Sequence, residues 1–179
     1  MADEEFLLAF LGFWPPTNAE GLSGAVMVTN ERGYPLEFRV TTPVRPSPMQ
    51  KALYGATLDT YLILELIGKR LISELQRRPH FCFTNMRDAV AVESSFPLFF
   101  VAPSDSIVFM GDDAQVSYQR VEPVDGVSQA IGIISSDGAV LSDALPRIKA
   151  GVRYFDPLAT FDRMRTALSV LAESDARYR

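Results

Sequence analysis

The side chains best suited to chemistry in this sequence are a glutamate, two arginines and a tyrosine, clustered where a strand gives way to a helix. Because side chains alternate along a strand, Glu37 and Arg39 lie on the same face of the predicted strand. Arg45 follows in the connector, and Tyr54 and Asp59 lie near the start of the predicted helix. Two guanidinium groups can bind a carboxylate or phosphate through paired hydrogen bonds, helped by the positive end of the helix dipole. These residues therefore predict a site for an anionic small ligand, with Glu37 as the candidate general base.

The same charges also fit a structural role. In that interpretation Glu37 pairs with one arginine, and the other arginine binds backbone carbonyls of the proline-rich connector at residues 43–48. Paired charges near a protein surface are common and catalytic ones are rare, so the internal network is the favoured interpretation. The two interpretations differ in whether Arg39 and Arg45 line a cavity.

The other reactive side chains fit structural roles better than chemical ones. His80, the sole histidine, has no serine or acid placed beside it by a known catalytic motif. It shares a strand face with Cys82, but the sequence nearby offers no two further metal ligands. Cys82 lies between two phenylalanines, where burial raises the pKa of a thiol and leaves it unreactive. The Gly-Asp-Asp at 111–113 is typical of a turn, and phosphate-loop motifs are missing. We therefore expect no metal and no cofactor.

The composition is that of a folded protein without a membrane segment. The 179 residues are 47% hydrophobic and 22% charged, which predicts a single domain over residues 1–179 with a substantial core. The apolar run at 6–14 follows three acidic residues and ends at two prolines, so it resembles neither a signal peptide nor a membrane span. We expect it to form a buried strand or an amphipathic N-terminal arm. The single cysteine and the lack of a signal peptide predict a reducing cytoplasm.

Charge is unevenly distributed along the chain, although the net charge is −5. Residues 31–87 carry nine bases and five acids, whereas residues 88–145 carry one base and nine acids. Without an overall basic surplus, nucleic acid is disfavoured as the main partner. Basic helices packed against an acidic sheet region are the favoured explanation, and an acidic face that docks a basic partner is the alternative.

The elements that position these residues begin with a hairpin and a helix. Two β-rich runs flanking Asn-Glu-Arg-Gly predict a β-hairpin over residues 23–43. A helix is predicted from Pro48, with a capping box at residues 47–50. Its apolar residues recur at helical spacing, so we expect one broad buried face. They are Leu53, Tyr54, Leu58, Tyr61, Leu62, Leu64 and Ile67. Gly68 is expected to end this helix, before a shorter helical piece at 71–77.

The middle of the chain predicts short alternating elements. A strand at 80–84 is followed by a brief helix that Asn85 can cap, and then by an apolar strand at 96–102. This order permits one parallel pair of strands. Residues 106–121 predict a second hairpin around the Gly-Asp-Asp turn, and residues 130–134 predict another strand.

The C-terminal helix has a clear start. Asp156 caps it and Pro157 opens it. Its inner stripe consists of Leu158, Phe161, Met164, Leu168 and Leu171. We therefore predict an α+β fold with a mixed, mostly antiparallel sheet, a long helix after the first hairpin and a C-terminal helix packed on the sheet.

Part of the chain resembles known families. Residues 28–39, 42–46 and 50–55 resemble a motif block of an uncharacterised bacterial protein family, a likeness that implies no activity. The Gly-Ala-Val-x-Val hairpin at 24–28, followed by a helix, is similar to roadblock and longin-like modules. That similarity implies an interaction platform of the kind found on small GTPases and in complexes, although the proline-rich connector departs from the pattern.

Two function classes follow from these observations. The leading hypothesis is a cytoplasmic, non-catalytic module that binds a protein partner or itself, motivated by the apolar N-terminal run and the uneven charge. The alternative is an anion-binding protein or enzyme that uses Glu37, Arg39 and Arg45, with Tyr54 beside them. Nucleic acid is the least expected partner.

Overall fold

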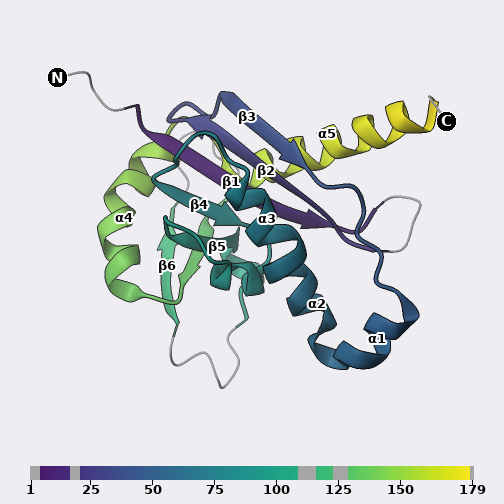
Figure 1. Ribbon diagram of the computed structural model, residues 1–179. Coiled ribbons are helices and arrows are strands. Elements are labelled where there is room, and N and C mark those ends of the chain that lie inside the picture. The colour runs from purple at the N-terminus through teal and green to yellow at the C-terminus, as the bar shows by residue number, and fades with distance from the viewer. Residues whose placement is uncertain (1–4, 17–20, 109–115, 123–128, 178–179) are drawn as a thin grey trace.

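The computed structural model describes residues 5–16, 21–108, 116–122 and 129–177 as a mixed sheet with helices on both faces (Figure 1). The strands are β1 (Leu7–Trp14), β2 (Ser23–Asn30), β3 (Pro35–Val40), β4 (Phe81–Thr84), β5 (Leu98–Pro103), β6 (Ser117–Val121) and β7 (Ile131–Ser135). The helical elements are α1 (Pro48–Tyr54), η1 (Gly55–Thr57), α2 (Leu58–Tyr61), η2 (Leu62–Gly68), α3 (Lys69–Ser73), η3 (Arg87–Ala91), η4 (Ser104–Ser106), α4 (Gly138–Gly151) and α5 (Pro157–Arg177).

The strand order across the described sheet is β3-β2-β1-β4-β5-β7-β6. β1, β2 and β3 pair antiparallel, β4 and β5 continue parallel to β1, and β7 and β6 complete the sheet antiparallel. The predicted α+β class with a mostly antiparallel sheet is therefore confirmed. The hairpin predicted at residues 23–43 is confirmed as β2–β3, and the predicted parallel pair is confirmed as β4–β5.

β1 is buried on both faces. Leu8 and Phe10 belong to a core shared with α4 and α5, whereas Leu11 and Phe13 belong to a second core shared with η2 and α3. A strand covered on both sides needs an apolar residue at nearly every position, and the run at residues 6–14 supplies this. Of the two interpretations of that run, the buried strand is correct.

The helical stretch after the hairpin starts as predicted and ends later than predicted. The side chains of Ser47 and Gln50 form the expected capping box with each other's backbone N–H groups. Gly68 does not end the helix, because its φ of −61° is helical and α3 continues to Ser73, short of the predicted residue 77. A Cβ at position 68 would lie 2.6 Å from a methyl group of Val92, so the glycine permits close packing of this helix against the segment after η3.

The first half of this stretch does not lie on the sheet. α1, η1 and α2 bury none of their residues, and Leu53 is 74% exposed. Burial begins with Leu62 in η2. The prediction of one broad buried face is therefore wrong before Leu62, because the chain enters the helix away from the sheet and reaches it only at η2 (Figure 1). We call residues 48–61 the arm.

Two predictions for the middle of the chain are corrected by long-range contacts. Asn85 does not cap the following helix. Its Oδ1 accepts from the backbone N–H of Phe13 at 3.0 Å, and its Nδ2 donates to the Phe13 carbonyl at 3.3 Å. The hairpin predicted over 106–121 is also wrong, because β6 pairs with β7 and residues 104–106 form η4. The turn predicted at 111–113 lies outside the described residues.

The C-terminal half contains one helix that the sequence analysis missed and one that it found. α4 begins at an Asp137 N-cap and continues through Pro146, a residue that argues against a helix interior. α5 begins as predicted, with the Asp156 carboxylate accepting from the backbone N–H of Leu158 at 2.8 Å. Its predicted inner stripe ends early, because Leu171 is 45% exposed. Among the described helices, none combines the length and apolar character required to span a bilayer.

The Asn85 side chain extends the pairing of β1 with β4 beyond the last strand residue, so its loss should be costly. We expect Asn85→Ala to lower the free energy of unfolding by about 1–3 kcal/mol, since the Phe13 N–H and carbonyl lose their partners. Urea unfolding followed by circular dichroism measures the change. Ser136→Ala, at an exposed position, is the control and should change stability by less than about 0.5 kcal/mol. Equal unfolding midpoints for the two variants would contradict this role of Asn85.

Candidate functional site

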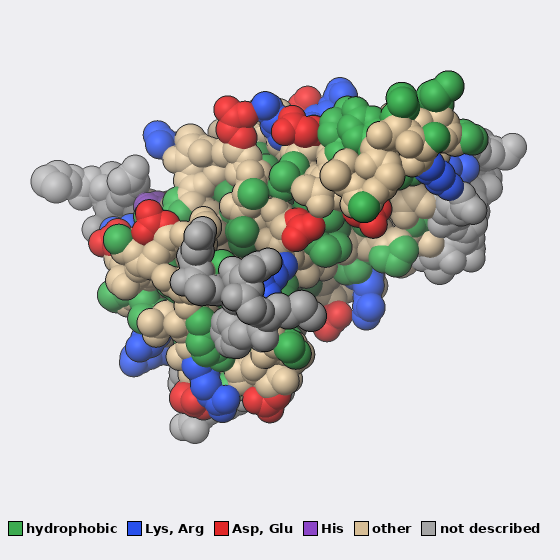
Figure 2. Space-filling model, turned by 90° about the horizontal axis from the view of Figure 1, so that it is seen from below, with side chains coloured by type: hydrophobic (Ala, Val, Ile, Leu, Met, Phe, Trp, Pro, Cys, Tyr) green, Lys and Arg blue, Asp and Glu red, His purple; other side chains and the backbone are tan. Residues whose placement is uncertain are grey.

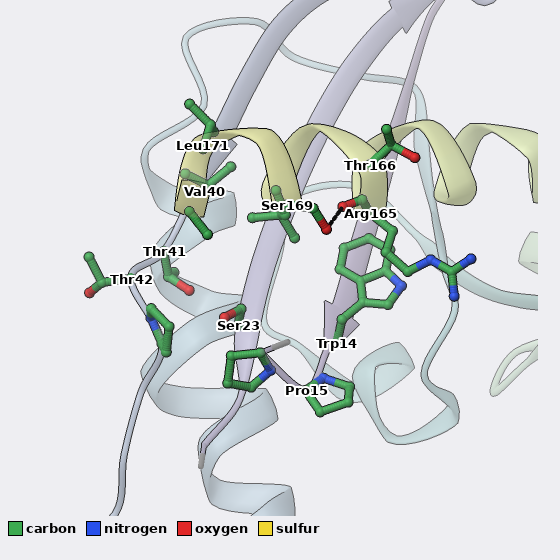
Figure 3. Close-up of a pocket in the computed structure, with 14 residues that line it drawn as sticks. Trp14, Pro15, Ser23, Val40, Thr41, Thr42, Arg165, Thr166, Ser169 and Leu171 are labelled. Atoms are coloured by element: carbon green, nitrogen blue, oxygen red, sulfur yellow. Dashed lines mark hydrogen bonds between the residues drawn. The ribbon is translucent and has the colours of Figure 1, made fainter. Parts of the chain in front are cut away.

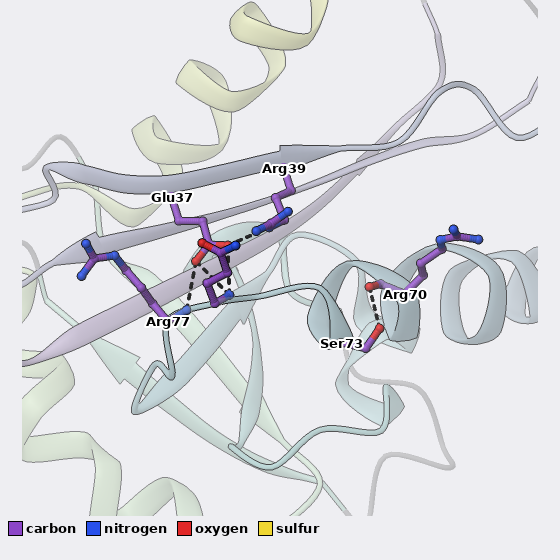
Figure 4. A network of polar contacts seen from close by, with 6 residues as sticks. Glu37, Arg39, Arg70, Ser73 and Arg77 are labelled. Atoms are coloured by element: carbon purple, nitrogen blue, oxygen red, sulfur yellow. Dashed lines mark hydrogen bonds and ion pairs between the residues drawn. The ribbon is translucent and has the colours of Figure 1, made fainter.

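Glu37 of β3 is held by donors from two elements. The Nε of Arg39 donates to its carboxylate at 2.7 Å. The backbone N–H groups of Gln76 and Arg77, which follow α3, donate to the same carboxylate at 3.1–3.2 Å (Figure 4). We call these contacts the Glu37 network. They tie the outermost described strand at this side of the sheet to the end of α3, which is a structural task.

The Glu37 network fixes the ionisation of its carboxylate. The side chain of Glu37 is only 10% exposed. Burial by itself would raise its pKa, but the Arg39 guanidinium and the two backbone N–H groups outweigh burial and lower the pKa below the ordinary value of 4.5. A general base works best with a pKa nearer to neutral and with room for a substrate proton. The geometry of Glu37 and Arg39 thus matches the internal network considered above.

Arg45 lies apart from the Glu37 network. Leu22 and Val44 pair through two backbone hydrogen bonds, and this bridge holds the connector beside the start of β2. The Cγ of Arg45 is 3.2 Å from where a Cβ on Gly21 would be. Among the described residues, no hydrogen bond or ion pair joins Arg45 to Glu37.

Tyr54 also lies apart, because it belongs to the arm. Its ring stacks on that of Tyr61 with 4.3 Å between centroids. A hydrogen bond between the two hydroxyl groups raises the pKa of Tyr61. Asp59, in the same arm, is exposed. The predicted cluster is thus divided between β3, the connector and the arm.

A groove of about 510 Å³ opens beside Arg39. Arg70 of α3 and Glu74, which directly follows α3, line it together with residues 39–42, which lead from β3 toward the connector. We call it the Arg39 groove. Figure 4 shows the Arg70 guanidinium pointing away from the Glu37 carboxylate. Arg70 was missed as a site residue, because a basic residue near a helix C-terminus is already explained by the helix dipole.

His80 and Cys82 occupy structural positions. The backbone N–H of Leu7 donates to Nδ1 of His80 at 3.3 Å, and the His80 ring lies 4.7 Å from that of Phe6. Cys82 is fully buried, which raises the pKa of its thiol far above the ordinary value. In the described part of the chain, no three histidine, cysteine or acidic side chains gather as metal ligands would.

A second groove, of about 330 Å³, opens where the ends of β1, β2 and β3 meet the C-terminal half of α5 (Figure 3). Its apolar wall consists of Trp14, Val40, Leu168 and Leu171, and hydroxyl side chains and Arg165 surround this wall. We call it the Trp14 groove. It combines segments that are distant in the sequence, so no local motif could predict it. The sequence feature that points to this groove is Leu171, the exposed last residue of the predicted apolar stripe of α5.

The floor of the Trp14 groove depends on a small residue. A Cβ at Gly12 would lie 2.0 Å from the indole ring of Trp14, so the ring folds back over the glycine. The same ring lies 6.5 Å from that of Phe161. At the rim, the Arg165 guanidinium pairs with Asp162 at 3.3 Å. The groove is therefore apolar at its base and charged only at its edge.

The arm presents a further apolar surface. Met49 is 67% exposed and Leu53, one helical turn later, is 74% exposed. Figure 2 shows hydrophobic side chains gathered at the right of the view, where α1 and α2 lie in Figure 1. Large exposed apolar side chains that lie together mark interaction surfaces in folded proteins.

Comparison with known proteins assigns no family. No protein-family model matches the chain, and no curated protein matches it. Among solved structures, Argonaute from Marinitoga piezophila in complex with 5′ OH guide RNA is similar over 87% of this chain, at 13% identity and a TM-score of 0.45. This chain spans 27% of the length of that Argonaute chain. A similarity of this degree says nothing about function, so function is inferred below from the surfaces of the chain itself.

The lowered pKa of Glu37 predicts a pH-dependent contribution to stability. At neutral pH, Glu37→Gln should lower the free energy of unfolding by about 1.5–3 kcal/mol, because it replaces the charged acceptor of these hydrogen bonds with a neutral amide that has one acceptor oxygen. Since folding lowers this pKa, the contribution is present above the ordinary value of 4.5 and is lost as the pH falls below it. Urea unfolding of both proteins between about pH 7 and pH 3 should therefore give converging stabilities in acid. A difference that stays constant down to about pH 3 would show that the charge is irrelevant.

Proposed function

We propose that this chain is a non-catalytic module of a reducing cytoplasm that binds an apolar segment of a protein partner in the Trp14 groove. The supporting observation is the groove itself, in which Val40 and Leu171 remain 38% and 45% exposed beside Trp14. Apolar side chains this exposed around a concave surface gain free energy when a partner excludes water from them.

The lining indicates the chemistry of the partner. A central tryptophan with aliphatic neighbours suits a leucine, methionine or aromatic side chain as the anchor. Hydroxyl groups at the rim, such as those of Thr42 and Thr166, suit backbone hydrogen bonds, and Arg165 suits an acidic neighbour of the anchor. An apolar stripe of a helix with one flanking acid meets all three requirements.

Photocrosslinking from the groove tests this function. With a benzophenone amino acid in place of Thr42, we expect crosslinked polypeptides in the cells that make this chain, because Thr42 is exposed at the groove. The same substitution at Lys149, exposed on α4, is the control and should give none. Leu171→Glu should abolish the products from position 42. Equal products from both positions, or none from position 42, would contradict the proposal.

A second candidate function is the binding of a small anion, and the Arg39 groove favours it. Arg39 and Arg70 both line this groove, and Arg39 uses only its Nε in the ion pair with Glu37. The remaining N–H donors of the two guanidinium groups can bind a phosphate or carboxylate. Glu74 lies in the same groove and limits the negative charge that fits there.

Thermal unfolding with inorganic phosphate, nucleotides and dicarboxylic acids tests this second function. A ligand of the Arg39 groove should raise Tm, and Arg70→Ala should remove the rise without changing Tm in its absence, because Arg70 is exposed. Arg45→Ala is the matched control and should keep the rise, since Arg45 does not line this groove. The function would be excluded if no anion raised Tm, or if Arg70→Ala left the rise intact.

A further inference from the structure

The arm and the Trp14 groove are uncovered apolar surfaces at the same end of the molecule. In Figure 1, α1 lies at the lower right, below the strands, and the C-terminal half of α5 lies at the upper right, so both are on the right-hand side of the molecule. Residues 41–47 join the two surfaces directly, because residues 41–43 line the groove and Pro48 begins the arm. A second molecule brought against this end therefore meets both surfaces at once.

The arm has the properties of a helix whose apolar face is stable only when another surface buries it. It consists of 14 residues in three short helical segments, and none of these residues is buried. Isolated helices of this length are marginal in water, and most of their stability comes from packing of an apolar face. Met49 and Leu53 form such a face, one turn apart, and nothing in the described chain covers it.

We propose that the Trp14 groove takes the arm of a second copy of this chain, and that two copies exchange arms in a two-fold dimer. The inference rests on the proposed function and names its partner. Leu53 is the anchor that enters between Trp14 and Leu171. Because each copy gives one arm and receives one, the assembly closes as a pair instead of continuing as a filament.

The number of residues involved matches what a stable dimer needs. The arm has 14 residues, and 14 other residues line the groove. Reciprocal exchange therefore offers at most 28 residues of each copy to the interface, and about 20–30 a side are found in standard interfaces. Docking of a single arm would use half of them and fall short of that range.

Charge also fits this occupant. The whole chain has a net charge of −5, so two copies repel unless the surfaces that meet carry complementary charges. The arm contains the exposed Lys51 near its start and the exposed Asp59 near its end, so the acidic end of the arm is the one that suits the exposed Arg165 at the rim of the groove. Arg165 is paired with Asp162 of its own helix, and such an exposed pair is weak enough to accept a second acid.

Sedimentation equilibrium tests the dimer, with Trp14 as an internal reporter. The wild type should dimerise at about micromolar concentrations, and its fluorescence should shift to the blue as it does so, because Trp14 is the only tryptophan. Leu53→Glu and Leu171→Glu should each raise the dissociation constant about 30-fold or more. Val140→Glu, on the exposed face of α4, is the matched control and should leave dimerisation unchanged.

Mixing the two groove and arm variants distinguishes exchange from other dimers. Leu53→Glu keeps an intact groove and Leu171→Glu keeps an intact arm, so the mixture can form one good contact per pair. We expect the mixture to associate more tightly than either variant alone and less tightly than the wild type, which has two good contacts per pair. Charge reversal tests the same contact with variants of a single chain. Asp59→Arg and Arg165→Asp should each weaken the dimer, and the double variant should recover part of the lost affinity.

The outcomes separate this inference from the proposed function. A wild type that stays monomeric at about 100 µM overturns the inference, as does a dimer insensitive to Leu53→Glu and Leu171→Glu. Circular dichroism and urea unfolding of each variant show whether loss of the dimer reflects misfolding. If a glutamate variant is misfolded, Met49→Lys and Leu53→Ser replace it. These variants must then weaken the dimer. If crosslinks from position 42 contain a different protein and never this chain, the proposed function stands and the exchange of arms fails.

Discussion

The burial of β1 on both faces is the constraint on which the rest of the structure depends. A strand with no solvent-facing side must be apolar along its length, and it must find backbone partners on both edges. The β2–β3 hairpin satisfies one edge and β4 satisfies the other. Where β4 ends, the Asn85 side chain replaces the missing backbone partner of Phe13. The strand then leaves the sheet at Trp14, and this exit places the only tryptophan at the edge of the core, where it lines a groove.

Local patterns in the sequence predict the elements whose causes are themselves local. The capping box at residues 47–50, the Asp156 cap and the hairpin at 23–43 depend on neighbouring residues, and the structure has all three. The errors have long-range causes. Asn85 stands before a short helix and resembles a cap, but its partner is 72 residues away. α4 was missed because Pro146 argues against a helix, although α4 accommodates it within an otherwise regular element.

The candidate site could be predicted only in part, for the same reason. Alternation along a strand is enough to place Glu37 and Arg39 together, and they do pair. The N–H groups that complete the network belong to Gln76 and Arg77, which no spacing rule connects to β3. Helical spacing shows that the arm has an apolar face, but it does not show what covers that face. A periodic pattern predicts that burial is needed, and the burying surface can belong to another molecule.

The Glu37 network and the arm lie at opposite ends of one helical stretch, because the network binds residues just after α3 and the arm is the start of the stretch. The stretch is fixed after α3 by the carboxylate of Glu37 and in its middle by the buried Ile67 and Leu71. From Tyr61 back to Pro48 none of its residues is buried, so its direction is set by the anchored part. A charged network and an apolar surface, which the sequence pattern treats separately, thus lie at the two ends of one helical stretch.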